Sequence, residues 1–328
     1  MDQRIGERQR WAWLASGLSA AVAACACGFS WAWVLGAGLL VTVYYIYMDI
    51  RLRPRGLSAM LPQVLGKPGR VLAVLTLIWM VLLMAWAANL ADGAFPMVNG
   101  YPVLGWSVLA LAAWGSWKGA GACARCAGVR CLFLLALYGV VIVFAVPDVQ
   151  LNYLLPKGSW QDGFLTVGLF LLPAAVWYVP CTRSKKKAAW QMALLLPAFA
   201  GILTAVTSGV LSPTLARSQP SPLYSLAQSV SLFGVVERIE PLLSAAMTMG
   251  AFCLVSAMAC ACGNLWGQIR SWRWSGVVCC AAAGALMKPA QSIDFRVITA
   301  GNVIFMVVIP VVILLLGKQR EKKARNGV

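Results

Sequence analysis

Charge and histidine are scarce in this 328-residue chain: 11% of its residues are charged, and it contains no histidine. A typical soluble domain carries about 25% charged residues, because its surface faces water. Here 61% of the residues are hydrophobic, and the mean hydropathy is +0.77. The composition excludes an ordinary soluble domain and predicts that most of the chain lies in a lipid bilayer.

The absence of histidine excludes further classes of function. Histidine is the side chain that most often transfers protons in enzymes, and it is the commonest metal ligand. We therefore expect no enzymatic activity, no catalytic residue, no bound metal and no other cofactor. Cysteine, in contrast, occurs 11 times. Most cysteines lie within apolar runs, where they act as small residues that permit close helix packing: Cys25, Cys27, Cys253, Cys260, Cys262, Cys279 and Cys280.

One group of cysteines has the spacing of a metal or redox site. The sequence CARC contains Cys123 and Cys126, and Cys131 follows it. Three thiolates could hold a metal, but neither a histidine nor a second CxxC motif completes a set of four ligands. We interpret the group as structural, and the metal or redox role stays open as an alternative.

The apolar runs predict an all-α integral membrane protein with about ten transmembrane helices. Each run is long enough, or nearly so, to cross about 30 Å of hydrocarbon, which takes about 17 to 25 residues. No soluble domain separates them, so residues 1–328 are expected to form a single transmembrane domain. The ten predicted spans are Trp11–Gly28, Trp31–Met48, Val71–Ala91, Pro102–Trp117, Cys131–Val146, Gly163–Cys181, Ala189–Leu211, Pro241–Trp266, Trp274–Met287 and Val297–Gly317.

The net charge of +17 is distributed unequally between the two sides of this layout. All but five of the 27 lysines and arginines fall on the side of the N-terminus. The five exceptions are Lys157, Arg217, Arg238, Lys288 and Arg296. By the positive-inside rule, the N-terminal residues 1–10 and the basic tail 318–328 are cytoplasmic, and residues 212–240 form an external interfacial segment. The basic excess is therefore a topology signal, and we expect no nucleic-acid partner.

Four of the predicted spans contain candidate helix interruptions. Pro197 and Pro310 interrupt spans 7 and 10, and spans 1 and 6 are the pair that an inverted repeat would relate. Span 6 contains Gly168, Pro173 and Pro180, and span 1 contains Ser16 and Gly17. Proline removes a backbone donor, and paired interruptions in the two halves of a transporter mark the discontinuous helices that hold substrate. If the chain divides five and five, spans 1 and 6 correspond in an inverted repeat. The sequence predicts unwinding in span 6, whereas the span 1 pattern is more often a packing surface.

The predicted spans contain no Asp, Glu, Lys or Arg, which argues against a proton relay through the membrane. Backbone carbonyls and hydroxyl groups could still bind a small zwitterion. The candidate hydroxyls are Ser16, Thr204, Thr207, Ser208 and Thr248.

The sequence VVERIEPLL places Glu237, Arg238 and Glu240 immediately before Pro241 and the apolar run of span 8. Proline suits the first turn of a helix, and the acids complement its positive N-terminal end. These charges either anchor the helix start or hold the external segment as a lid or a subunit contact. Both interpretations stay open.

The segment FGVVERIEPLLSAAMTMGAFCLVSAMACACGNLW resembles the B subunits of spore germinant receptors, the GerAB-like spore germination permeases of the amino acid/polyamine/organocation superfamily. The stretch from WVLGAGLL to LADGAF resembles that family's second and third helices. LNYLLPKG, TRSKKKAAW and SPLYSLAQSVSLFGVVERIEPL then follow in the family's order. The resemblance covers nearly the whole chain. It implies a LeuT-like fold with 5+5 inverted repeats and a ligand pocket between broken helices 1 and 6.

The resemblance also implies a function. A germinant-receptor B subunit in the spore inner membrane would bind a small nutrient such as an amino acid and signal germination with A- and C-type subunits. The pocket between spans 1 and 6 would then draw on Ser16, Gly17, Gly168, Phe170, Pro173 and Thr248. Span 1 lacks the family's longer glycine-rich stretch, and span 6 lacks its Gly-Gly-aromatic-acid run. Two alternatives therefore stay open: an amino-acid transporter of the same superfamily, and a scaffold subunit that binds no ligand.

Overall fold

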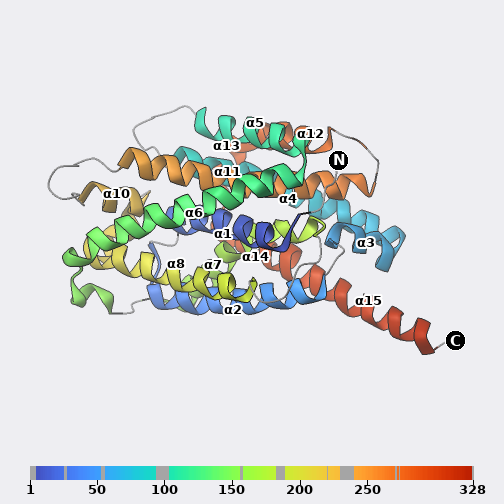
Figure 1. The fold of residues 1–328 in the computed structure, drawn as a ribbon, viewed down its shortest axis with the longest axis horizontal. Helices are drawn as coiled ribbons and strands as arrows, with labels where there is room; N and C mark the ends of the chain where they lie inside the picture. The colour runs from blue at the N-terminus through green and yellow to red at the C-terminus, as the bar shows by residue number, and fades with distance from the viewer. Residues whose placement is uncertain are drawn as a thin grey trace.

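The computed structural model describes most of the chain (Figure 1). The described residues are 5–25, 28–52, 56–93, 103–155, 158–181, 189–219, 221–229, 240–269, 272 and 274–326. Within these ranges, the backbone alone is described at residues 24–25, 189–194, 240 and 321–326.

Every regular element in these ranges is a helix, apart from one isolated parallel bridge between Ile5 and Cys181. The first half of the chain forms α1 (Glu7–Cys25), α2 (Trp31–Arg51), α3 (Leu57–Leu65), α4 (Lys67–Gly93), α5 (Val103–Lys118), α6 (Ala120–Ala145), η2 (Val146–Asp148) and η3 (Leu151–Leu154). The second half forms α7 (Trp160–Leu171), η4 (Leu172–Tyr178), α8 (Ala189–Leu211), α9 (Pro213–Ser218), α10 (Pro222–Ser229), α11 (Glu240–Gly267), α12 (Ser275–Ala285), α13 (Met287–Gln291), α14 (Phe295–Val303), η5 (Ile304–Val308) and α15 (Ile309–Asn326).

The long helices run roughly along one axis of the bundle, so the bundle has two ends (Figure 1). We name them after the short helices they carry: the α3 end, on the right in Figure 1, and the α10 end, on the left. Helix α1 begins in the half of the bundle nearer the α3 end, and α15 ends beyond it. The start of the first span and the end of the last one therefore lie toward the same end.

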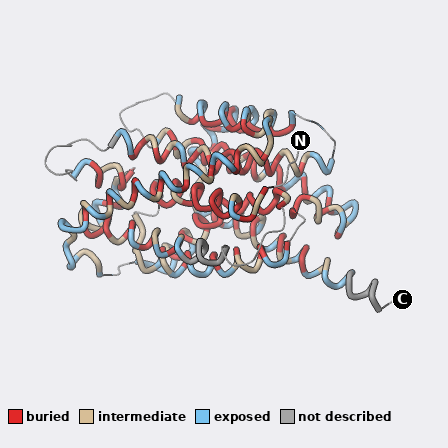
Figure 2. Tube along the Cα trace, viewed as in Figure 1, coloured by how far each residue is buried: buried red, intermediate tan, exposed pale blue. Residues whose placement is uncertain are grey.

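Five of the described helices are long and apolar enough to cross a membrane: Trp31–Arg51, Lys67–Gly93, Ala120–Asp148, Pro241–Gly267 and Phe295–Arg320. Large apolar side chains such as Leu40, Val43, Leu132 and Val143 are exposed on the outside of the bundle, while the buried residues concentrate inside it (Figure 2). An exposed apolar surface of this kind suits lipid rather than water. The all-α membrane character predicted from the sequence is confirmed, whereas the count of ten spans stays a prediction.

Helix α1 lies at the centre of the packing. From Trp11 to Ala23 its side chains are apolar or small, and all but Ser19 are buried, as expected for a helix surrounded by protein. A Cβ atom placed on Gly250 of α11 would lie only 2.6 Å from the Cβ of Ala20, so the two backbones approach closely there. The Trp13 indole donates a hydrogen bond to the Cys253 carbonyl of α11 at 2.8 Å. Small residues on both helices permit this contact.

Span 6 is interrupted as the sequence predicted. The α-helix ends at Leu171, and Leu172–Tyr178 continues as a 3₁₀ helix before the chain becomes extended at Val179. Pro173 lies in the first turn of the 3₁₀ segment, where it removes a backbone donor. Pro180 disfavours helical geometry at the residue before it, which explains the extended Val179.

The predicted interruption of span 1 is wrong, because α1 runs without a break from Glu7 to Cys25. The run around Ser16 and Gly17 contains no proline, so no backbone donor is lost. The Ser16 hydroxyl donates to the Ala12 carbonyl one turn back, at 2.9 Å, and its oxygen also lies 3.1 Å from the Ala127 carbonyl of α6. The run is therefore a packing surface.

Candidate functional site around the interrupted helix

Two of the six predicted ligand residues meet where α1 passes the 3₁₀ segment. A Cβ atom placed on Gly17 would lie 3.4 Å from the Pro173 Cβ and 3.5 Å from Leu254 of α11. Ser16 is buried beside it on α1. The structure thus brings span 1 and the start of the span 6 interruption into direct contact, as the proposed pocket requires.

Gly168 and Phe170 lie one turn earlier, on α7, and both are closely packed. The Gly168 carbonyl accepts a hydrogen bond from the Asn302 amide at 3.1 Å, and a Cβ atom on Gly168 would overlap the Thr299 side chain. The Phe170 ring rests against Gly38, where a Cβ atom would lie 2.8 Å from the ring. These two residues join α7 to α14 and α2.

Thr248, the sixth predicted residue, lies on α11 and donates to the Ser244 carbonyl at 2.9 Å. No described contact joins it to the other five residues. None of the six lines any of the three cavities described for this structure. In this arrangement, side chains fill the contact between α1 and the interrupted helix.

A buried ion pair lies at the α3 end of the interrupted helix. Arg10 in the first turn of α1 approaches Asp49 in the last turn of α2, with Nη1 and Oδ1 3.4 Å apart. Only 1% and 4% of the two side chains is exposed. The Arg10 guanidinium also donates to the Val179 carbonyl at 3.3 Å and lies 4.9 Å from the centre of the Trp177 ring. The pair therefore joins α1, α2 and the end of span 6.

The three consecutive carbonyls at this end of span 6 accept hydrogen bonds from three different segments. The Tyr178 carbonyl accepts from the Ser58 hydroxyl of α3 at 2.8 Å, and the Val179 carbonyl accepts from Arg10. The Pro180 carbonyl accepts from the Ile5 amide at 3.1 Å. Buried carbonyls need such partners, and the end of the 3₁₀ helix leaves them without intrahelical ones.

The sequence does not predict the buried ion pair between Arg10 and Asp49. The two residues lie 39 positions apart, and no motif links them. One signal was present: an acid in the last turn of α2 opposes the negative end of the helix dipole. Such an acid, beside an otherwise apolar helix, indicates a cation from another segment.

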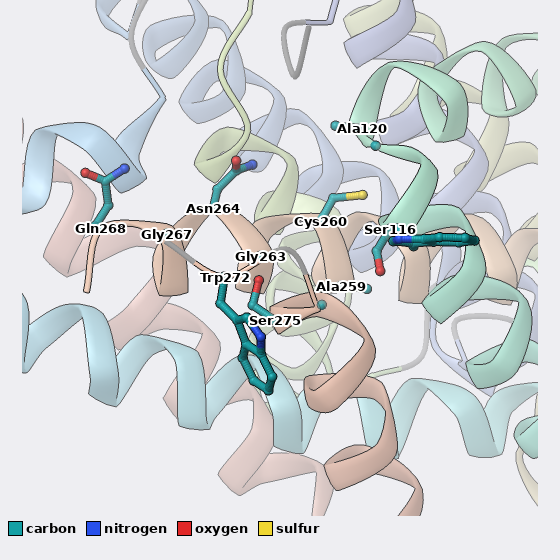
Figure 3. A pocket seen from close by; sticks show the side chains of 13 residues that line it. Ser116, Ala120, Ala259, Cys260, Gly263, Asn264, Gly267, Gln268, Trp272 and Ser275 are labelled. Atoms are coloured by element: carbon teal, nitrogen blue, oxygen red, sulfur yellow. The ribbon is translucent and has the colours of Figure 1, made fainter. Parts of the chain in front are cut away.

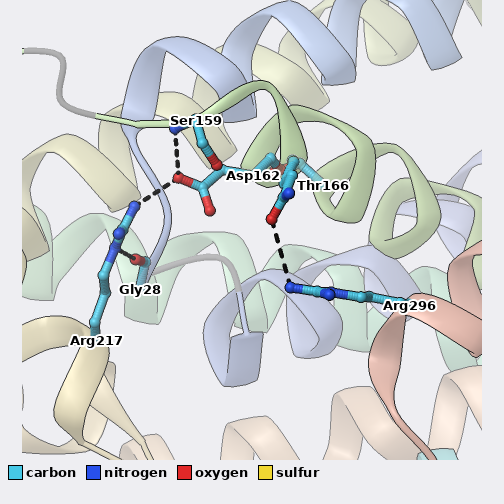
Figure 4. Close-up of polar contacts among 7 residues, drawn as sticks. Gly28, Ser159, Asp162, Thr166, Arg217 and Arg296 are labelled. Carbon is cyan, nitrogen blue, oxygen red and sulfur yellow. Dashed lines mark hydrogen bonds and ion pairs between the residues drawn. The ribbon is translucent and has the colours of Figure 1, made fainter.

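The α10 end of the interrupted helix is held by a second, more exposed ion pair (Figure 4). Asp162 lies in the first turn of α7, and its Oδ2 is 2.7 Å from Nη2 of Arg217. The same carboxylate accepts from the Ser159 amide at 3.1 Å, and Arg217 donates to the Gly28 carbonyl at 3.0 Å. A cavity of about 240 Å³ lies beside this pair. Charged contacts thus tie both ends of the α7–η4 segment.

We predict that the exposed pair contributes little to stability. The Arg217 side chain is 48% exposed, so Arg217→Gln should cost less than about 1 kcal/mol, because solvent screens the interaction. Asp162→Ala removes both the ion pair and the acceptor for Ser159 at the helix start, and it should cost about 1 kcal/mol more. Thermal unfolding of the purified variants measures this order. A larger loss of stability for Arg217→Gln than for Asp162→Ala would contradict this prediction.

The predicted external motif lies mostly outside the described residues. Glu237 and Arg238 are not among them, and Glu240 is described only as the backbone start of α11. Pro241 is exposed in the first turn of that helix. The described part of the segment 212–240 forms α9 and α10, where Leu223 and Leu226 are buried against the bundle.

The two cysteines of the CARC motif and the following Cys131 do not converge. All three lie on α6, with Cys123 and Cys131 buried and Cys126 exposed. Among the described residues, no group of three cysteine, aspartate or glutamate side chains is placed to hold a metal ion. The metal alternative thus finds no support in this part of the chain.

Comparison with known proteins adds no family assignment. The chain matches no protein-family model, and it matches no curated protein. The resemblance to the germinant-receptor family therefore stays a prediction from the sequence.

Proposed function

We propose that this chain is the membrane B subunit of a nutrient germinant receptor. It binds a small nutrient such as an amino acid and signals spore germination with A- and C-type subunits. The proposal includes ten spans, a 5+5 inverted repeat and residence in the spore inner membrane. The sequence resemblance supports it, and so does one structural observation: the interrupted span 6.

That observation carries the proposal for a physical reason. The 3₁₀ segment has poorer hydrogen-bond geometry than an α-helix, and long 3₁₀ runs are uncommon and often mark a functional hinge. An ion pair at each end fixes the α7–η4 segment, and Pro173 within this segment touches α1 at Gly17. A nutrient that enters beside Pro173 would favour one of two arrangements of this segment. It would shift their populations by its difference in affinity for them.

The sides of the membrane follow from the basic residues. Lys67, Arg70 and Lys118 lie in helices at the α3 end, as does the basic end of α15. The positive-inside rule makes the α3 end cytoplasmic, with both termini there. The nutrient would then arrive from the α10 end, where Asp162 and Arg217 lie.

Two other functions each have an observation in their favour. Ion pairs at both ends of an interrupted helix also suit an amino-acid transporter that opens to each side in turn. The filled contact around Gly17 and Gly168 suits a scaffold subunit that binds no ligand. These functions are separate outcomes of the test below.

The test is dipicolinate release from spores of a deletion strain exposed to a panel of amino acids and sugars. Loss of the response to one nutrient class, restored by the wild-type gene in trans, is the expected result. Restoration with Gly17→Leu should fail, because the added side chain would displace Pro173 or Leu254. Gly36→Leu is the matched control, since a Cβ atom on Gly36 meets nothing within 4 Å.

Responses that stay unchanged for every nutrient would count against the receptor. Amino-acid uptake into liposomes that contain the purified chain would then favour the transporter. Co-purification of the A- and C-type subunits, without uptake and without a thermal shift by any nutrient, would favour the scaffold.

A further inference from the structure

The largest described cavity lies at the α3 end, away from the six predicted ligand residues. Its volume is about 570 Å³, within the range of about 300 to 1,000 Å³ that is usual for small-molecule sites. It lies between the ends of α5 and α11 and the starts of α6 and α12 (Figure 3). The described lining residues are Ser116, Trp117, Gly119, Ala120, Ala259, Cys260, Gly263, Asn264, Gly267, Gln268, Trp272, Ser275 and Gly276.

One face of α11 supplies a row of polar side chains to this cavity. Cys260, Asn264 and Gln268 are four residues apart, so they lie along one side of the helix, and Figure 3 shows them projecting from it together. Gly263 and Gly267 lie next to this row. Glycines at this spacing usually admit a neighbouring helix in membranes. A Cβ atom on Gly263 would lie 3.7 Å from Ser275 Oγ of α12, whereas one on Gly267 would meet nothing within 4 Å.

Several of the polar groups have no partner. Within the described part of the chain, no hydrogen bond is formed by the side-chain amides of Asn264 and Gln268 or by the Ser275 hydroxyl. Ser275 is 4% exposed, Asn264 is half-buried and Gln268 is exposed. None of the described lining side chains is charged. The cavity therefore offers unpaired neutral donors and acceptors.

Two indole rings complete the lining. Trp117 is fixed by stacking on Trp274, with ring centres 5.5 Å apart and planes at 15°. Trp272 is 46% exposed. The negative π face of an indole attracts the partly positive C–H groups of a saturated ring.

From this lining we infer that the cavity is a second binding site, for an uncharged polyhydroxylated ring of monosaccharide size. A hydroxyl group both donates and accepts, and so do the Asn264 and Gln268 amides and the Ser275 hydroxyl. A charged ligand would find no opposite charge among the described lining residues, and burying it would be costly. The ring could belong to a free sugar or to the head group of a neutral glycolipid, because both present the same hydroxyls.

The test is equilibrium binding of radiolabelled D-glucose to the purified full chain in nanodiscs that lack glycolipid. Saturable binding in the millimolar range is expected. Gly263→Leu should weaken it at least tenfold, because its Cβ atom would point toward Ser275 Oγ, 3.7 Å away, and the side chain would occupy the cavity. Gly36→Leu, an identical change on α2 with nothing within 4 Å, should bind like the wild type.

A second set of nanodiscs, made with glucosyl-diacylglycerol, separates the two sources. Release of bound D-glucose by this lipid, or retention of the lipid without glucose binding, assigns the site to the head group. Absence of saturable binding for both probes overturns the inference, as does equal binding by Gly263→Leu and wild type.

Alkylation of Cys260 gives an independent measurement if Gly263→Leu does not fold. Cys260 lines the cavity, whereas Cys126 is exposed elsewhere on α6. The bound probe should slow iodoacetamide modification of Cys260 about fivefold or more and leave Cys126 unaffected. Asn264→Leu should remove this protection. Equal rates at Cys260 with and without either probe, or protection that survives Asn264→Leu, would contradict the inference.

Discussion

Replacing Arg10 with leucine should lower the free energy of unfolding by about 3 to 5 kcal/mol, because it removes the guanidinium from a buried ion pair with the Asp49 carboxylate. The variant also removes the donor to the Val179 carbonyl at the end of the interrupted helix. At about 2 to 4 °C per kcal/mol, the melting temperature of the purified chain should fall by roughly 10 °C.

Two further variants control for this result. Arg8→Leu removes an arginine that is exposed in the same turn of α1, and it should change the melting temperature little. The double variant Arg10→Leu/Asp49→Leu removes both charges and should recover much of the loss, since an apolar pair can replace a buried ion pair. A double variant that is less stable than Arg10→Leu alone would show that the carboxylate does not depend on Arg10.

Gly168→Leu should be the most disruptive of the glycine substitutions at the predicted ligand residues. Even a Cβ atom at this position would overlap Thr299, so the larger side chain should cost about 3 kcal/mol or more in thermal unfolding. Thr299→Ala should relieve part of the loss. Gly17→Ala is the matched contrast, because its Cβ atom would meet Pro173 at an ordinary 3.4 Å and should be tolerated. Equal losses at Gly17 and Gly168 would contradict the packing described here.

The sequence predicted the features that depend on local chemistry. Long apolar runs identified the helices, because lipid requires each span to satisfy its own backbone. Pro173 and Pro180 located the interruption in span 6, because proline acts on its immediate neighbours. For span 1, the residue types of Ser16 and Gly17 favoured a packing surface, and the expectation of a broken helix came from the family resemblance. The contact with Ala127, 111 residues away, decided between them.

The sequence could not predict features that form where distant segments of the chain meet. Asp49 lies beside Arg10, and Asn264 lines a cavity. Both results depend on how the helices are positioned relative to one another. The spacing of Cys260, Asn264 and Gln268, four residues apart, is compatible with one helix face, but spacing alone does not show what covers that face.

The three carbonyls from Tyr178 to Pro180 have a consequence for the synthesis of the protein. Their donors, Ile5, Arg10 and Ser58, leave the ribosome first, and even Ser58 precedes its acceptor by 120 residues. At about 5 to 20 residues per second, that interval is roughly 6 to 24 s. During this time Arg10 lacks its hydrogen-bond acceptor at Val179, because that residue has not yet been synthesised. Arg10 can pair with Asp49 once α2 has been made, whereas its hydrogen bond to Val179, like those of Ile5 and Ser58 to the neighbouring carbonyls, forms only after span 6 has been synthesised.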